Sequence, residues 1–193
     1  MQESGLNFNF PKDWKVIKFD EHRFYQYVNG IGLKGVDFIC IKANGELLLI
    51  EVKNYADRFP QNGIKPALAL LDNPIPYAEQ IAIKFEDSTR LIEVIHKFYL
   101  RKFWFRTFAQ KLSLILSEFF KPNFDWMFWL QAYQALSSHP PKTRLIWWME
   151  LGDEVSKVDR SMVHIEMTTF FMEEDISVSI LDRFSEQEEI QAS

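Results

Sequence analysis

The chain has 193 residues, a formal net charge of −5, and 47% hydrophobic and 16% aromatic residues. This length is typical of one domain with a sizeable core, and the apolar content excludes a disordered chain. The negative net charge excludes a protein coated with positive charge for nucleic acid.

The N-terminal segment 1–13 is polar and aromatic, which predicts an irregular lead-in. It lacks a basic region followed by an apolar run, so we expect no signal peptide. No stretch of the chain reaches the roughly 18 uninterrupted apolar residues of a membrane span, so we expect no membrane partner. Residues 14–19 are typical of an outer strand, and residues 20–27 of a short helix with Asp20 as its N-cap.

Two apolar runs, 36–41 and 47–52, flank the dipeptide Asn44-Gly45, which is typical of a hairpin turn. Both runs are too apolar for a sheet with one wet face, so they belong in the middle of a covered sheet. The only cysteine, Cys40, lies in the first run. We interpret it as a packing residue and, because no disulfide framework is possible, expect a cytoplasmic protein.

Three charged residues interrupt this hairpin: Asp37, Glu51 and Lys53. Because strand side chains alternate, Glu51 and Lys53 share one face, whereas Val52 points the other way into the core. Pairing across the turn brings Asp37 beside the Glu51 and Lys53 end of the second strand. Two carboxylates and an ammonium therefore converge at one end of a buried hairpin.

Buried charges of this kind are costly unless they are paired or hold a metal. Carboxylate oxygens suit Mg²⁺, which prefers one or two carboxylates together with waters and a substrate phosphate. A lysine beside such an ion could orient or deprotonate a water that attacks phosphorus. The plain alternative is a salt bridge among the three side chains at the end of a sheet.

A long loop with about one helical turn is predicted over residues 56–77, which are rich in proline. Loops of this length often form a lid or a binding surface. Arg58 and Lys65 within it could contact a phosphate backbone. Asn54 and Tyr55 directly follow the lysine and would line the mouth of the site.

Residues 78–101 predict a helix with one apolar stripe. Further helices are expected at 103–120 and 124–136, and together they form a helical insertion of about residues 103–138. Its large aromatic residues have three interpretations: core packing, stacking on bases, or the seam of a homodimer.

The C-terminal part predicts strands and one ambiguous segment. Residues 142–151 are apolar on both faces, which is typical of a central strand. Residues 159–172 fit a helix by spacing and a strand by composition. An edge strand is expected around 176–180, and the acidic end 186–193 is expected to fray.

The charges are unevenly distributed along the chain. Residues 84–111 contain seven basic and three acidic side chains, a balance of +4, whereas residues 150–193 contain twelve acidic and three basic ones, a balance of −9. This asymmetry permits one positive face for phosphate binding, although a solvated helix face explains the basic stretch equally well.

The spacing of Asp37, thirteen further residues and then Glu51-Val52-Lys53 within LLLIEVKNY resembles the PD-(D/E)XK superfamily of restriction-endonuclease-like nucleases. The resemblance covers residues 35–55 and is not specific elsewhere. Val36 stands where the family name has proline, a departure that many members tolerate. In this superfamily the aspartate, glutamate and lysine form a Mg²⁺ site, in which Mn²⁺ can substitute.

The resemblance implies roles for these residues. Asp37 and Glu51, together with the Val52 carbonyl, would hold the metal, and Lys53 would position the water. Members often carry an additional acid on a helix before the aspartate strand. Glu21 matches this placement, with Asp20 as the second choice, while capping and solvation are the plain alternatives for both.

The helix after the glutamate strand often offers a polar or basic residue to the site in this superfamily. The resemblance therefore implies Gln80 and Lys84 as nucleic-acid contacts, beside Asn54 and Arg58. A simple exposed pair is the alternative for Gln80 and Lys84.

These inferences combine into one prediction for residues 1–193: a single three-layer α/β/α domain of restriction-endonuclease-like type, with a mixed central sheet and helices on both faces. The predicted activity is Mg²⁺-dependent hydrolysis of phosphodiester bonds in nucleic acid, DNA more than RNA. Two alternatives remain open. One is a catalytically inactive nuclease-fold module that binds nucleic acid or protein. The other is a dimeric interaction protein of a defence or toxin system.

Overall fold

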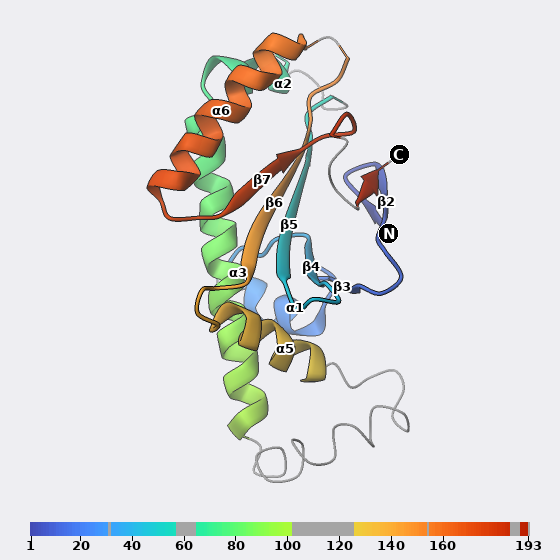
Figure 1. The fold of residues 1–193 in the computed structure, drawn as a ribbon, viewed down its shortest axis with the longest axis vertical. Coiled ribbons are helices and arrows are strands. Elements are labelled where there is room, and N and C mark those ends of the chain that lie inside the picture. The colour runs from blue at the N-terminus through green and yellow to red at the C-terminus, as the bar shows by residue number, and fades with distance from the viewer. Residues whose placement is uncertain (31, 57–64, 102–125, 154, 186–189, 193) are drawn as a thin grey trace.

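The computed structural model describes residues 1–30, 32–56, 65–101, 126–153, 155–185 and 190–192. A five-stranded mixed sheet lies at its centre, in the order β3-β4-β5-β6-β7 (Figure 1). The strands are β3 (Lys15–Lys18), β4 (Phe38–Ile41), β5 (Leu47–Asn54), β6 (Thr143–Glu150) and β7 (Val178–Leu181). Neighbours from β3 to β5 are antiparallel, whereas β5, β6 and β7 are parallel.

The β4–β5 hairpin confirms the prediction from Asn44-Gly45. The Lys42 N–H donates to the Glu46 carbonyl at 2.9 Å, and the Asn44 side chain accepts from the Glu46 N–H at 3.0 Å. Gly45 has a φ of +81°, a conformation that residues with a Cβ rarely adopt. The turn therefore sets the register in which Phe38 lies opposite Ile50.

The described helices are α1 (Arg23–Asn29), α2 (Pro66–Asp72), α3 (Ile75–Arg101), α5 (Trp126–Leu136) and α6 (Lys157–Glu173). The sequence prediction is confirmed for the helices α3 and α5 and for the strands β6 and β7. The ambiguous segment is the helix α6, which Ser156 caps by accepting a hydrogen bond from the Asp159 N–H at 3.1 Å. Helical spacing therefore outweighed the β-branched composition of this segment.

The helices cover one face of the sheet. Odd-numbered side chains of β5 and β6 point to this face because strand side chains alternate. Two hydrophobic clusters form there. One joins β6 to α2, α3 and α6, the other joins β4 and β5 to α3 and α5, and Phe85 of α3 packs against both.

A second, small sheet covers the opposite face, where we expected a second layer of helices. It consists of β1 (Gln2–Glu3), β2 (Leu6–Asn9) and β8 (Gln191–Ala192). Phe8, Trp14 and Ile190 pack there against Leu48, Ile50 and Val52 of β5, among others. For the described residues, the expectation of helices on both faces is therefore wrong, as are those of an irregular N-terminus and a frayed segment 190–192. These three side chains of β5 are apolar, and the aromatic N-terminal segment excludes water from them.

The helix α5, which the sequence predicts as part of an insertion, packs in the main core. Trp129 is fully buried and packs against Phe19, His22 and Phe24. It therefore offers no surface for a homodimer, and core packing is the correct interpretation of this aromatic residue. The helix predicted at 103–120 lies outside the described residues. No helix among the described residues has the length and apolar character needed to span a bilayer.

We expect Trp129→Ala to lower the free energy of unfolding by about 3–5 kcal/mol, because it leaves a large cavity between α5 and α1. Urea unfolding followed by circular dichroism measures this loss. The oligomeric state by sedimentation should not change. A variant as stable as the parent would contradict the core assignment, and Phe98→Ala, at a 45% exposed position on α3, is the matched control.

Candidate functional site

The candidate site lies where β5 passes beneath α3. Glu51 and Lys53 are on the helix-covered face, and Glu51 is fully buried. Lys84, in the third turn of α3, lies over this part of the strand and binds Glu51. The predicted shared face of Glu51 and Lys53 is therefore confirmed.

Asp37 comes directly before β4 and is held beside β5 by its own backbone and side chain. Its N–H donates to the Ile50 carbonyl at 3.0 Å, although the Cα partner of Ile50 is Phe38. This offset of one residue resembles a β-bulge and turns the Asp37 side chain toward the end of β5. Its Oδ2 accepts a hydrogen bond from the Val52 N–H at 2.7 Å. The hairpin thus brings Asp37, Glu51 and Lys53 together, as predicted.

Side chains of the helices fix the segment that leads into Asp37. The Lys34 N–H donates to Asp87 at 3.0 Å, and the Val36 N–H donates to the Ser88 hydroxyl at 2.9 Å. Between them, the Gly35 N–H donates to the Tyr25 hydroxyl at 3.3 Å. Three successive backbone N–H groups therefore donate to side chains of the helices, the first and third to α3 and the second to α1. These hydrogen bonds hold Asp37 in one position.

Gly35 is required for the approach of α1 to this segment. A Cβ at this position would lie 2.8 Å from the Tyr25 ring and 2.9 Å from the Phe19 ring. Both distances are shorter than normal contacts between carbon atoms. The glycine thus allows the Tyr25 hydroxyl to reach the backbone beside the site.

Two ammonium groups neutralise Glu51. Lys53 and Lys84 both donate to the same oxygen, Oε1, and the Lys84 Nζ lies 2.6 Å from it. The other oxygen, Oε2, is buried and has no hydrogen-bond partner among the described residues. The two lysine side chains keep 23% and 22% of their exposure, so solvent reaches part of each lysine side chain and not the carboxylate.

The environment shifts the pKa values of two of these groups. Burial, followed by the negative charge of Glu51, raises the pKa of Asp37 to about 7, although Lys84 and the Val52 N–H oppose the shift. Burial alone would lower the pKa of Lys84, but the charges of Glu51 and Asp37 raise it above its usual value. The Lys84 ammonium therefore stays charged near neutral pH, whereas Asp37 is about half protonated.

The other predicted residues lie apart from this cluster. Glu21 is in the turn before α1, where its carboxylate pairs with Lys18 at 2.8 Å and is 68% exposed. Gln80 is exposed on α3. Asn54 is buried and donates to the Ser4 carbonyl at 3.1 Å, on the face that carries the small sheet. Arg58 lies outside the described residues. Asp20 accepts from the Glu21 N–H at 3.0 Å, so it is a turn residue before the helix.

Sequence reasoning missed the roles of Asp87 and Ser88. Both are buried on α3, although polar residues are uncommon on the apolar side of a helix. The apolar stripe of this helix has a spacing of seven positions from Phe85 to Ile92, and Ser88 lies within that interval at helical spacing from both. A polar residue at a core position of a helix was therefore the signal that could have identified it.

The oxygen donors of the site are of the types that Mg²⁺ prefers. Asp37 and Glu51 offer hard carboxylate oxygens, and the buried Oε2 of Glu51 lacks a partner among the described residues. In a strand the N–H and C=O of one residue point to the same edge, so the Val52 carbonyl faces the Asp37 side. In their chemistry, these oxygen donors are of the kind that binds Mg²⁺. No cluster of three or more His, Cys, Asp or Glu side chains suited to a metal occurs in the described ranges.

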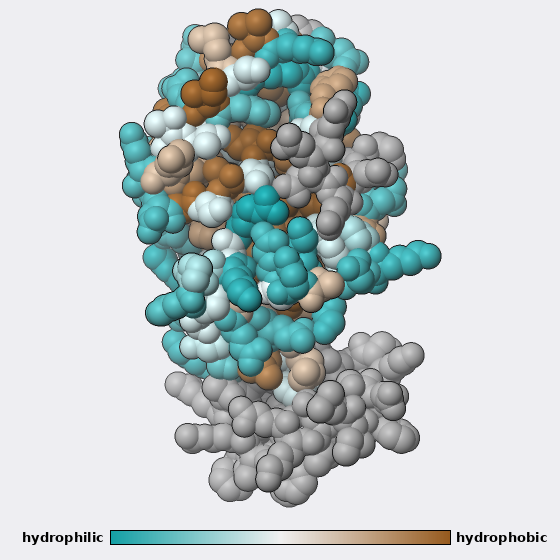
Figure 2. Space-filling view, viewed as in Figure 1, coloured by the Kyte–Doolittle hydropathy of each residue, from teal (hydrophilic) through white to brown (hydrophobic). Residues whose placement is uncertain are grey.

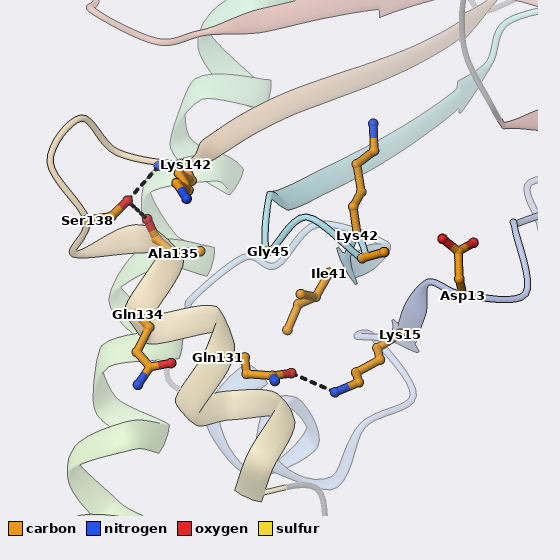
Figure 3. A pocket seen from close by; sticks show the side chains of 11 residues that line it. Asp13, Lys15, Ile41, Lys42, Gly45, Gln131, Gln134, Ala135, Ser138 and Lys142 are labelled. Carbon is orange, nitrogen blue, oxygen red and sulfur yellow. Dashed lines mark hydrogen bonds between the residues drawn. The ribbon is translucent and has the colours of Figure 1, made fainter.

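A cavity of about 330 Å³ lies at the opposite end of the sheet, beside the Gly45 turn. Several lysines line it, but their side chains do not converge (Figure 3). Lys15 binds Gln131 at 2.8 Å, and Lys42 extends away from that pair. This cavity is therefore a weaker candidate for a functional site than the cluster around Glu51.

Comparisons with protein-family models, with curated proteins and with solved structures found no match. The resemblance to the PD-(D/E)XK nucleases stays a prediction.

We expect Asp37→Asn to remove a pH dependence of stability. The raised pKa means that the folded protein holds a proton that the unfolded chain releases near pH 4, so the stabilising effect is lost as the pH rises toward and through about 7. The free energy of unfolding of the parent, minus that of Asp37→Asn, should thus fall between pH 4 and pH 8. The fall is at most about 4 kcal/mol, because each unit of pKa shift corresponds to about 1.4 kcal/mol. Urea titrations of both proteins over this range measure it, and parallel curves would contradict the shift.

Proposed function

We propose that this protein is a Mg²⁺-dependent hydrolase of phosphodiester bonds in nucleic acid, with DNA as the first candidate substrate. The single observation that carries the proposal is the hydrogen bond between Asp37 and the Val52 N–H, because it holds one carboxylate beside the strand that carries Glu51 and Lys53. Two acids and an amine at the end of a hairpin are the arrangement on which the resemblance rests.

A restriction-endonuclease-like fold is part of the same proposal. The order β3-β4-β5-β6-β7 supports it, because the antiparallel hairpin that carries the acids is followed by helices and then by a parallel strand. The connection from β5 to β6 contains α2, α3 and α5, and α3 contributes Lys84 to the site. The small N-terminal sheet takes the position where a second helical layer was expected.

Each residue then has a definite task. Asp37 and Glu51 would hold Mg²⁺ with the Val52 carbonyl, and the bound ion would supply positive charge for the phosphate oxygens. Lys53 would donate a hydrogen bond to the attacking water and so orient it, since its side chain is partly open to solvent. Lys84 would contact the phosphate or restrain Glu51. Burial of the two carboxylates keeps bulk water from competing for the ion.

We expect cleavage of plasmid, linear or single-stranded DNA in the presence of Mg²⁺ or Mn²⁺, reduced at least about 100-fold in Glu51→Gln and in Lys53→Met. Gel assays at pH 8, where Asp37 is mostly ionised, measure it. Glu86→Gln, which alters an exposed carboxylate on α3, should retain full activity. The proposal fails if the parent protein cleaves neither DNA nor RNA with either ion, or if Glu51→Gln is as active as the parent.

A non-catalytic nuclease-fold module is the second candidate, and one observation favours it. Both ammoniums share one oxygen of Glu51, so the two lysines by themselves pair the carboxylate. Such a pair contributes structure without any ion. This candidate predicts a folded protein that takes up no Mg²⁺.

Removal of Lys84 separates the two candidates. For a metal site, Lys84→Met should bind Mn²⁺ about tenfold more tightly than the parent, because a competing cation 2.6 Å from the ligand oxygen is gone. Titration calorimetry at pH 8 measures the affinity. Glu51→Gln should bind no ion. If neither the parent nor Lys84→Met takes up Mn²⁺, the non-catalytic module is correct.

A further inference from the structure

The helix α6 has two apolar faces, and only one of them is covered. Val163, Met167 and Phe171 are buried against the sheet and α3. On the outer side, four large apolar side chains are 64% to 73% exposed. These four are Val158, Met162, Ile165 and Met172. A surface helix normally has polar residues opposite its buried face, so this second face requires an explanation.

The exposed apolar residues are spaced for contact with another helix. Their intervals are 4, 3 and 7 residues, and the exposed Thr169 divides the last interval into 4 and 3. Alternation of 4 and 3 is the heptad pattern with which two helices pack along a line. We call Val158, Met162, Ile165, Thr169 and Met172 the outer seam.

The outer seam runs along the outer edge of the molecule. Figure 1 shows α6 on the margin of the helical layer, and Figure 2 shows apolar side chains along the same margin, separated by polar ones. The large apolar side chains of the outer seam are mostly exposed to solvent. The seam is therefore accessible to a partner.

A row of carboxylates flanks the outer seam on one side. Asp159, Glu166 and Glu173 follow Val158, Ile165 and Met172 in sequence, so they repeat every seven residues on the same side of the helix. All three are exposed, and within the described ranges Glu166 and Glu173 form no ion pair. The other side has the uncharged Ser161 and Thr168.

This acidic row excludes several partners. Nucleic acid and anionic membranes both require basic side chains beside the contact, and the row would repel them. A second copy of the chain fits poorly as well. In an antiparallel pair of α6 helices the two acidic rows would face each other, and in a parallel pair each row would face Ser161 and Thr168 without forming an ion pair.

We propose that the outer seam of α6 docks a helix of another protein, one with an apolar heptad face flanked by lysine or arginine. The apolar seam supplies contact area, and the acidic row pairs with the basic flank and sets the orientation. A contact between single helices lies at the low end of interface sizes, below about 1,200 Å², so we expect micromolar affinity. This proposal is independent of the nuclease proposal, because it uses no residue of the Glu51 cluster.

The test uses the full chain and two synthetic helical peptides of about three heptads, with leucine along the apolar face and either lysine or glutamate at the flanking positions. Fluorescence anisotropy should show that the lysine peptide binds at least about tenfold more tightly than the glutamate peptide, and that added salt weakens binding. Ile165→Lys should abolish binding of the lysine peptide. The double variant Glu166→Lys with Glu173→Lys should reverse the preference, a result that nonspecific attraction to an apolar surface would not produce.

Val94→Lys is the matched control, because Val94 is 55% exposed on α3, in the half of that helix that packs beside α5. It should bind the lysine peptide like the parent, and all variants should melt within about 2 °C of it, as expected for exposed positions. Equal binding of the two peptides overturns the proposal. Unchanged binding of the lysine peptide by Ile165→Lys also overturns it. A third contrary result is that the parent chain sediments as a dimer and that Ile165→Lys dissociates this dimer.

Discussion

The burial of the Glu51 carboxylate is the constraint on which the rest of the site depends. A fully buried carboxylate without a partner would destabilise the fold by several kcal/mol, so the chain must bring positive charge to it. Lys53 comes from the same strand two residues later, but Lys84 must come from α3. Pairing with Lys84 therefore helps to fix both the position and the rotation of α3 over β5.

Once α3 is fixed in this way, it also determines where Asp37 lies. Asp87 and Ser88 are three and four residues after Lys84, so they lie one helical turn further along the same side of α3. They bind the backbone of the segment that precedes Asp37. One helix thus neutralises the first carboxylate and positions the second, while the apolar clusters on both sides, which share Phe85, exclude water from the polar centre.

The sequence predicted the centre of the fold better than its covering layers, for a physical reason. Asn44-Gly45 and the flanking apolar runs are local signals, so the hairpin and the convergence of Asp37, Glu51 and Lys53 could be predicted. The small sheet could not, because its strands have two to four residues and Phe8 pairs with Ala192 at the other end of the chain. Glu21 was assigned to the site by its place in the chain alone, but it pairs locally with Lys18, which no pattern revealed.

The charges of the cluster also limit how a metal and a substrate could bind. Asp37, Glu51, Lys53 and Lys84 sum to zero when Asp37 is ionised and to +1 when it is protonated. For the proposed function, a divalent cation would raise the sum to +2 in a buried site, and such an excess is costly. A phosphate brings the compensating negative charge, so ion and substrate should bind more tightly together than separately. The second lysine on Glu51 would then have a physical rationale, because Lys84 would keep the carboxylate paired before an ion binds and would afterwards be available to the phosphate.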